Sequence, residues 1–213
     1  MPGRPIRWTE GWQAFSGSPY LNDPVQHVTV RHNIPGPPSF FEWQTLYYFL
    51  FTAEQTNRTL LQPVLQYGPS PAGGGQYWSL ASWFLFNGVL YYSALVPVPD
   101  GVVELVGHIE RVAPGSFKVW YEGYPETEIS VDGYPEQAGA GIACETYGFF
   151  SRRLDANAST DFVANVVTLD TTTQTQLAVT WNVNNLRSGA TVTIANNNTP
   201  SPTMTIHCPT SPR

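Results

Sequence analysis

The chain has 213 residues, enough for one domain with a sizeable hydrophobic core. Charged residues make up 12%, about half the usual share of a soluble domain, whereas aromatic residues reach 14%. Between Arg58 and Asp100 there is no Asp, Glu, Lys, Arg or His, and the net charge is −6. This charge distribution excludes a disordered acidic chain and a coiled coil, and it argues against nucleic acid as a partner.

The first 40 residues are rich in proline, which fixes φ and removes a backbone donor. We therefore expect residues 1–40 to form an irregular arm packed on a domain of residues 41–213. Within the arm, one short strand is predicted at Val25–Arg31, where valines alternate with polar residues.

From Phe40 onward, short stretches of β-branched and aromatic residues are separated by Gly, Pro, Asn or Asp, and no window shows a helical stripe. This pattern predicts an all-β, two-sheet antiparallel β-sandwich of the jelly-roll type. The expected strands lie near Gln44–Phe51, Thr59–Tyr67, Gln76–Phe86, Leu90–Val98, Val102–Arg111, Ser116–Gly123, Thr127–Val131, Ile142–Phe149, Asp161–Leu169, Gln176–Asn184, Ala190–Ala195 and Thr203–Cys208.

The uncharged stretch Tyr77–Val98 is long enough to cross a membrane. Serines and the pair Asn87-Gly88 interrupt it, and it lacks flanking Lys or Arg anchors. We therefore predict two strands joined by a tight Asn-Gly turn instead of a membrane span.

Both faces of the Gln76–Phe86 strand are free of charge, so both should be covered. Ala81 and Trp83 share one face, and Leu80 and Phe84 share the other. One face should fill the core, while the second should line a ligand cleft, enlarge the core or form a homodimer interface. For the cleft, the expected substrate-binding residues are Tyr48, Tyr67, Trp78, Trp83, Tyr91 and Tyr92.

No common catalytic or cofactor motif is present. The run Gly73-Gly74-Gly75 lacks the context of a phosphate-binding loop and is interpreted as a flexible connection. The four histidines (His27, His32, His108 and His207) have no metal-ligand spacing, although pairs can meet in space, and the acidic run from Glu122 to Glu136 is typical of a solvated edge. No metal and no cofactor are expected.

Gln66 and Glu145 are the two polar residues that most resemble a reacting pair. Gln66 lies at the end of an expected strand, within the charge-free region between Arg58 and Asp100, and Glu145 follows the Gly-rich segment Gly139–Gly141. A carboxyl group in an aromatic cleft has its pKa raised by desolvation, and a neighbouring amide can donate to a developing oxyanion. The alternative is structural, with both side chains buried and paired by hydrogen bonds.

Compartment signals are sparse. Cys144 and Cys208 are the only cysteines and are a candidate disulfide or two buried thiols. Three glycosylation sequons occur, at Asn57, Asn157 and Asn197. Together with few lysines, these features favour a secreted protein whose signal peptide has been removed, with a cytoplasmic protein as the alternative.

The segments Val64-Leu65-Gln66-Tyr67-Gly68 and Cys144-Glu145-Thr146 resemble those of the fungal glutamic peptidases (eqolisins). These are small secreted β-sandwich enzymes with a concanavalin-like fold. The resemblance spans roughly residues 44–169. It implies that Gln66 and Glu145 form the catalytic pair, with Glu145 as the general base for water and Gln66 stabilising the oxyanion.

The chain departs from the family pattern around this pair. The stretch Thr45–Phe51 has neither the family's Trp nor its Asp, and Ser82–Leu85 lacks the carboxylate of the family's next strand. Such an apolar cleft favours a diverted function, similar to that of fungal β-sandwich cyclases of natural-product biosynthesis, including hetero-Diels–Alderases. A pericyclic enzyme needs a dry, shape-matched cavity and a hydrogen-bond donor for a small apolar or aromatic substrate. An acid glutamic peptidase is the alternative function, and a lectin-like binding module is the third.

Overall fold

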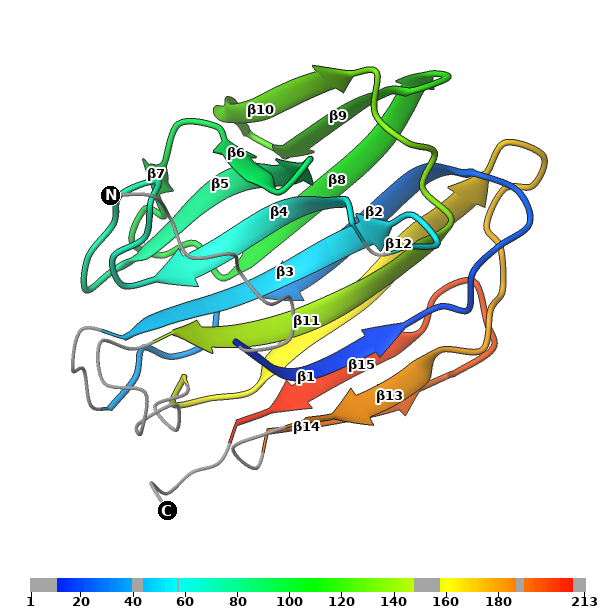
Figure 1. The fold of residues 1–213 in the computed structure, drawn as a ribbon. Helices are drawn as coiled ribbons and strands as arrows, with labels where there is room; N and C mark the ends of the chain where they lie inside the picture. The colour runs from blue at the N-terminus through cyan, green and yellow to red at the C-terminus, as the bar shows by residue number, and fades with distance from the viewer. Residues whose placement is uncertain (1–10, 40–43, 57, 148–157, 187–189, 209–213) are drawn as a thin grey trace.

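The computed structural model describes residues 11–39, 44–56, 58–147, 158–186 and 190–208, and in them the chain forms two antiparallel β-sheets and no helix (Figure 1). The first sheet has the strand order β13-β1-β11-β3-β4-β5-β6, with β7 paired to β5, and the second has the order β10-β9-β8-β2-β12-β15-β14. The predicted two-sheet sandwich is therefore confirmed. The strands are β1 (Trp12–Gly17), β2 (Val25–Asn33), β3 (Thr45–Ala53), β4 (Leu60–Tyr67), β5 (Trp78–Phe86), β6 (Val89–Tyr92), β7 (Val96–Pro97), β8 (Glu104–Ala113), β9 (Ser116–Tyr121), β10 (Tyr124–Asp132), β11 (Gly139–Tyr147), β12 (Phe162–Thr171), β13 (Asn182–Asn185), β14 (Thr191–Ala195) and β15 (Thr203–His207).

The main core lies between the two sheets, because alternate side chains of every long strand point inward. Tyr48 of β3 stacks on Phe162 of β12 at 4.9 Å between ring centroids, which joins the two layers. Burying each large apolar side chain of this core stabilises the fold by about 1.5–3 kcal/mol. Phe117, Val119 and Tyr121 of β9 all face inward, as the alternation in the sequence predicts.

The uncharged stretch forms β5, β6 and β7. β5 and β6 are joined at Asn87-Gly88, where φ is +51° and +75°, the conformation expected of an Asn-Gly hairpin turn. The predicted hairpin is thus confirmed. No helix among the described residues is long and apolar enough to cross a membrane.

The N-terminal segment differs from the expected arm in residues 11–39. The expected strand at Val25–Arg31 is β2, which lies between β8 and β12 in the second sheet, and a further strand, β1, lies between β13 and β11 in the first. The prolines fall outside both strands, so they separate the strands without interrupting them. Two other expected strands are shorter: Leu90–Val98 divides into β6 and β7, and only Asn182–Asn185 of the stretch near Gln176 is a strand, β13.

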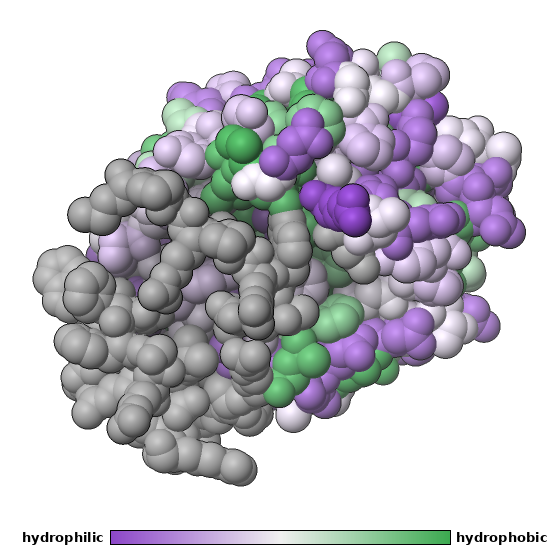
Figure 2. Space-filling model, viewed as in Figure 1, coloured by the Kyte–Doolittle hydropathy of each residue, from purple (hydrophilic) through white to green (hydrophobic). Residues whose placement is uncertain are grey.

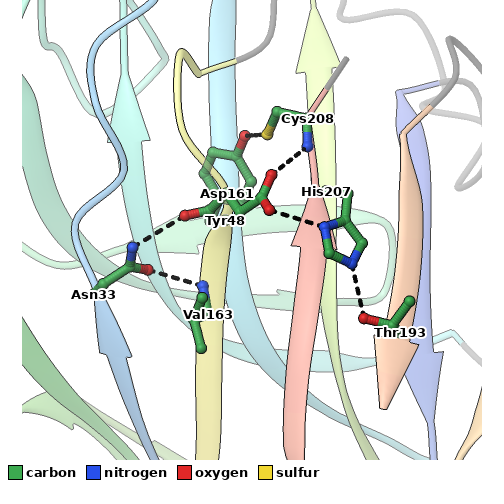
Figure 3. A network of polar contacts seen from close by, with 7 residues as sticks. All are labelled: Asn33, Tyr48, Asp161, Val163, Thr193, His207 and Cys208. Atoms are coloured by element: carbon green, nitrogen blue, oxygen red, sulfur yellow. Dashed lines mark hydrogen bonds and ion pairs between the residues drawn. The ribbon is translucent and has the colours of Figure 1, made fainter. Parts of the chain in front are cut away.

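A polar network around Asp161 fastens the start of β12 to its neighbours (Figure 3). One carboxylate oxygen accepts the Cys208 amide at 3.0 Å, and the other lies 2.8 Å from His207 Nδ1. The Asp161 carbonyl accepts the side-chain amide of Asn33 at 3.0 Å, and Thr193 Oγ1 lies 2.7 Å from His207 Nε2. The network links strands β2, β12, β14 and β15.

Cys144 and Cys208 are both buried free thiols, so the disulfide considered from the sequence is not formed in this structure. Cys208 Sγ instead lies 3.0 Å from the Tyr48 hydroxyl.

Of the three sequons, those at Asn57 and Asn157 lie outside the described residues. The third, Asn197, accepts the Trp181 amide at 2.8 Å and donates to the Trp181 carbonyl at 3.1 Å.

Candidate active site

The outer face of the first sheet carries a second apolar cluster, separate from the core between the sheets. This is the second covered face expected from the uncharged strand, and it includes Ala81 and Trp83 of β5. Figure 2 views the molecule from this side and shows hydrophobic side chains gathered in the region of β5 and β6. The buried members of the cluster are Tyr47, Phe49, Phe51, Ala53, Leu60, Val64, Ala81, Trp83 and Ala143.

A cavity of about 480 Å³ opens on this face. Its walls come from β3, β4, β5, β6 and β11 and from the loop that follows β4. Glu145 is the only acidic or basic residue among the described residues that line it. The lining residues are Thr45, Tyr47, Phe49, Gln62, Val64, Pro69, Ser70, Pro71, Trp83, Leu85, Gly88, Leu90, Glu145 and Tyr147.

Strand register brings Glu145 and Gln66 into one row across the sheet. Glu145 of β11 pairs with Tyr47 of β3, and Tyr47 pairs in turn with Gln66 of β4. Directly paired residues point to the same face, so all three side chains belong to the outer face. Tyr47 stands between the two residues that the sequence predicts to react together.

Glu145 is an acid held in largely apolar surroundings. Burial raises its pKa from the ordinary 4.5 to about 8, and a hydrogen bond with the Tyr147 side chain opposes this rise only in part. The direction is the one expected from the sequence. Burial and the nearby Glu145 also raise the pKa of Tyr47. Near neutral pH, Glu145 is therefore largely protonated and can donate a hydrogen bond or a proton.

Gln66 is fully buried and does not line the cavity. Its Nε2 donates to the carbonyls of Gly68 at 3.3 Å and Gly73 at 3.1 Å, and its Oε1 accepts the Ser70 hydroxyl at 3.1 Å. Both hydrogens of the amide are thus directed at backbone carbonyls. Gln66 clamps the loop from Gly68 to Gly74, whose Pro69, Ser70 and Pro71 form one wall of the cavity.

The clamp also explains the glycine run, which the sequence suggests is a flexible connection. Gly73 and Gly74 adopt φ of +108° and +107°, which L side chains rarely do. A Cβ on Gly74 would lie 2.6 Å from Gln66 Nε2 and from the Gly68 carbonyl oxygen. These glycines let the loop close tightly around the amide.

A Gln66→Leu variant should lose about 1–3 kcal/mol of unfolding free energy, because it removes the amide that the Gly68 carbonyl accepts. The Gly73 carbonyl and the Ser70 hydroxyl also lose one partner each but still hydrogen-bond to each other. Urea denaturation measures the loss, and limited proteolysis within residues 68–75 should become faster. Gln62→Leu, on the same face of the same strand but partly exposed, is the matched control and should change stability by no more than about 0.5 kcal/mol. Equal stability of the two variants would contradict the clamp.

The aromatic residues predicted for the cleft are divided among three places. Trp83 lines the cavity, and Tyr92 packs against it at 5.5 Å between ring centroids. Tyr91 is exposed and stacks on Phe84, a residue of the core. The expectation is corrected for Tyr48, Tyr67 and Trp78, which lie in the core between the sheets because they occupy the inward positions of their strands.

Sequence reasoning missed Tyr47 and Tyr147, which lie beside Glu145. It also missed Ser70 and Thr45, which hydrogen-bond to Tyr47 and line the same cavity. Strand alternation places Tyr147 on the face of Glu145, and a hairpin between β3 and β4 brings Tyr47 to the face of Gln66. Identifying them requires the register of β3 against both β4 and β11, which the sequence does not specify.

No protein-family model and no curated protein matches this chain. Solved structures do match: Scytalido-glutamic peptidase with a peptide-based transition-state analogue is 10% identical with a TM-score of 0.59. SCP-B, a member of the eqolisin family of peptidases, in complex with the tripeptide Ala-Ile-His, is 10% identical with a TM-score of 0.57. Each match covers 93% of this chain and 98% of the other. The chain therefore has the β-sandwich fold of the eqolisin glutamic peptidases, as the resemblance of its sequence implies.

Proposed function

We propose that this protein is an enzyme that binds an apolar small molecule in the outer-face cavity and promotes its cyclisation, with Glu145 as the acid. One observation carries the proposal: among the described residues that line the cavity, a single carboxyl group is kept protonated by burial and every other side chain is uncharged. A neutral carboxyl that donates to a substrate carbonyl is a known use of a raised pKa.

The chemistry needs no nucleophile from the protein. Glu145 donates its O–H to the carbonyl oxygen of the substrate, which draws electron density from an alkene in the same molecule toward the carbonyl carbon. In a carbonyl-ene or hetero-Diels–Alder ring closure, the new bonds form within the substrate, so the product has the substrate's formula. General acid assistance contributes on the order of 10²–10⁴-fold, and a cavity that holds the two ends together adds to it.

The distribution of polar groups indicates the shape of the substrate. Thr45, Tyr47, Ser70, Glu145 and Tyr147 gather where β3 begins and β11 ends, whereas the rest of the lining is mostly apolar. The cavity thus suits a molecule with an apolar body and one carbonyl or hydroxyl group.

The fold supports the peptidase alternative, whereas the hydrogen bonds of the Gln66 amide argue against it. An oxyanion donor needs a free N–H, and both hydrogens of the Gln66 amide are directed at Gly68 and Gly73. The apolar walls also offer few partners for a peptide backbone or for sugar hydroxyls, which weakens the lectin-like alternative as well.

Citronellal, an unsaturated aldehyde that acid converts to isopulegol, is a suitable probe. We expect the purified protein to speed this conversion at pH 7, as followed by gas chromatography. Glu145→Gln should lower the rate on the order of 10²–10⁴-fold, whereas Glu126→Gln, which removes an exposed carboxyl of β10, should leave it unchanged. Displacement of Nile red by citronellal reports binding separately from turnover.

Two results would contradict the proposal. One is the absence of both turnover and Nile red displacement. The other is cleavage of a denatured protein near pH 3 that is lost in Glu145→Gln, which would establish the glutamic peptidase. Specific binding on a glycan array, without either activity, would instead favour the lectin-like module.

A further inference from the structure

The second sheet carries a pair of histidines on its outer face, the opposite side of the sandwich from the cavity. His27 lies on β2 and His108 on β8, adjacent strands of this sheet. Val28 and Ile109, which neighbour them in the chain, are buried in the core, so the imidazoles point outward. Neither residue has a part in the proposed cyclisation.

The donor atoms of the pair converge with the hydroxyl of Thr29. His27 Nε2 and His108 Nδ1 are 3.4 Å apart, and Thr29 Oγ1 lies 3.2 Å from each nitrogen. Zinc–nitrogen bonds of about 2.0–2.1 Å in tetrahedral geometry place two ligand nitrogens about 3.3–3.4 Å apart. The observed spacing of the two nitrogens equals that of two ligands on one metal ion.

Hydrogen bonds among His27 Nε2, His108 Nδ1 and Thr29 Oγ1 cannot account for all three of their close contacts. A ring nitrogen either carries a proton or accepts one, and the hydroxyl has a single proton to give. If one of the two ring nitrogens is unprotonated, only the other nitrogen and the hydroxyl carry a proton. Two protons cannot make three hydrogen bonds, so one of the three close contacts has no proton between its atoms. When both are protonated, their N–H groups face each other at 3.4 Å. A cation beside the three atoms accepts lone pairs from all of them.

The surroundings hold the His108 ring in the orientation that a metal ligand needs. His108 Nε2 lies 3.8 Å from a Glu122 carboxylate oxygen, and the ring is nearly parallel to Trp120, with 4.6 Å between centroids and 5° between planes. At this distance the carboxylate is an ion-pair contact, and its negative charge favours a proton on the outer ring nitrogen, which leaves the inner nitrogen as a lone-pair donor. Carboxylates act on metal-bound histidines in the same direction. Glu110 pairs directly with His27 across the two strands and adds negative charge beside the site.

We propose that His27 and His108 form a binding site for a divalent transition metal such as Zn²⁺ or Cu²⁺, with Thr29 beside it and Glu122 orienting His108. No three His, Cys, Asp or Glu side chains converge on a metal position in the part of the chain that the structure describes. The remaining coordination positions therefore go to water or to a ligand from solution. Imidazole nitrogen suits zinc, copper and nickel, and it excludes magnesium and calcium as preferred ions.

Isothermal titration with Zn²⁺ and with Cu²⁺ tests the site on the intact protein. We expect one equivalent to bind, and His27→Gln and His108→Gln each to weaken binding by at least the 10–100-fold that loss of an orienting partner alone costs. His207→Gln, in which a partly exposed histidine of β15 is changed, is the matched control and should keep the affinity. Bound Cu²⁺ should also quench the part of the tryptophan fluorescence that Trp120→Phe removes, because that indole stacks on a ligand.

A second measurement uses the unaltered protein, so its result does not depend on whether the variants fold. In the imidazole region of the NMR spectrum, one equivalent of Zn²⁺ should shift the signals of His27 and His108 and leave those of His32 and His207 in place. The proposal is overturned if zinc shifts neither of the two predicted histidines, or if both glutamine variants, folded by circular dichroism, bind as tightly as the unaltered protein.

Discussion

A Glu145→Gln variant is expected to be more stable than the unaltered protein at pH 8.5, by on the order of 3–5 kcal/mol, and by no more than about 1 kcal/mol at pH 5. Burial raises the pKa of Glu145 from 4.5 to about 8, so the folded state holds a proton that the unfolded state releases. The free energy of unfolding should therefore fall as the pH rises from about 4.5 to about 8. Glutamine mimics the protonated acid and carries no such cost.

Urea denaturation at several pH values between 5 and 8.5 measures this difference. The unaltered protein should lose stability across the range relative to the variant. Glu126→Gln, at an exposed position of β10, should follow the unaltered protein at every pH. If Glu145→Gln also follows it, the Glu145 acid is ionised in the folded protein, and its role as a proton donor at neutral pH is wrong.

A Trp83→Ala variant should lose about 3–5 kcal/mol of unfolding free energy and most of its affinity for apolar ligands. Trp83 is 5% exposed, packs edge-on against Tyr47 at 5.6 Å and lines the cavity. Its indole N–H has no partner among the described residues, so the loss comes from packing and from an enlarged cavity.

Urea denaturation and a Nile red titration measure the two effects. Tyr92→Ala, which removes the exposed ring that packs on Trp83, should cost much less stability, because that ring is 42% exposed. Trp83→Phe keeps an aromatic ring in place and should fall between the two alanine variants. If Trp83→Ala binds Nile red as tightly as the unaltered protein, the dye and the cavity are unrelated.

The two-sheet fold and its second apolar face could be predicted from the sequence because they depend on local patterns. An uncharged strand with apolar residues at both odd and even positions must be buried on both faces of its sheet. β5 is such a strand, and its side chains are buried on both faces. The turn at Asn87-Gly88 follows from the ease with which these two residues adopt positive φ. β1 was missed because proline content describes the whole N-terminal segment and not the short runs between the prolines.

The site was predicted less completely, because it depends on register. Glu145 lines the cavity, as the sequence predicts for a carboxyl in an aromatic cleft, and its catalytic role stays a prediction. A list of aromatic residues cannot separate Trp83 in the cavity from Trp78 in the core without assigning faces. Gln66 was predicted to lie near Glu145, and they share a row of the sheet. What the sequence could not predict is that the loop after β4 turns back and takes up all three hydrogen bonds of the Gln66 amide.

The strand order of the two sheets has a consequence for how the chain acquires its structure during synthesis. Among the described strands, β1 pairs with β11 and β13, and β2 pairs with β8 and β12, so both wait for partners that are synthesised much later. Closing such long loops is slow, and strands that wait are exposed to wrong pairing. Glu145 itself arrives on β11, after β3, β4 and β5 are complete. The acid is thus placed on its wall of the cavity only when most of the chain has already been translated.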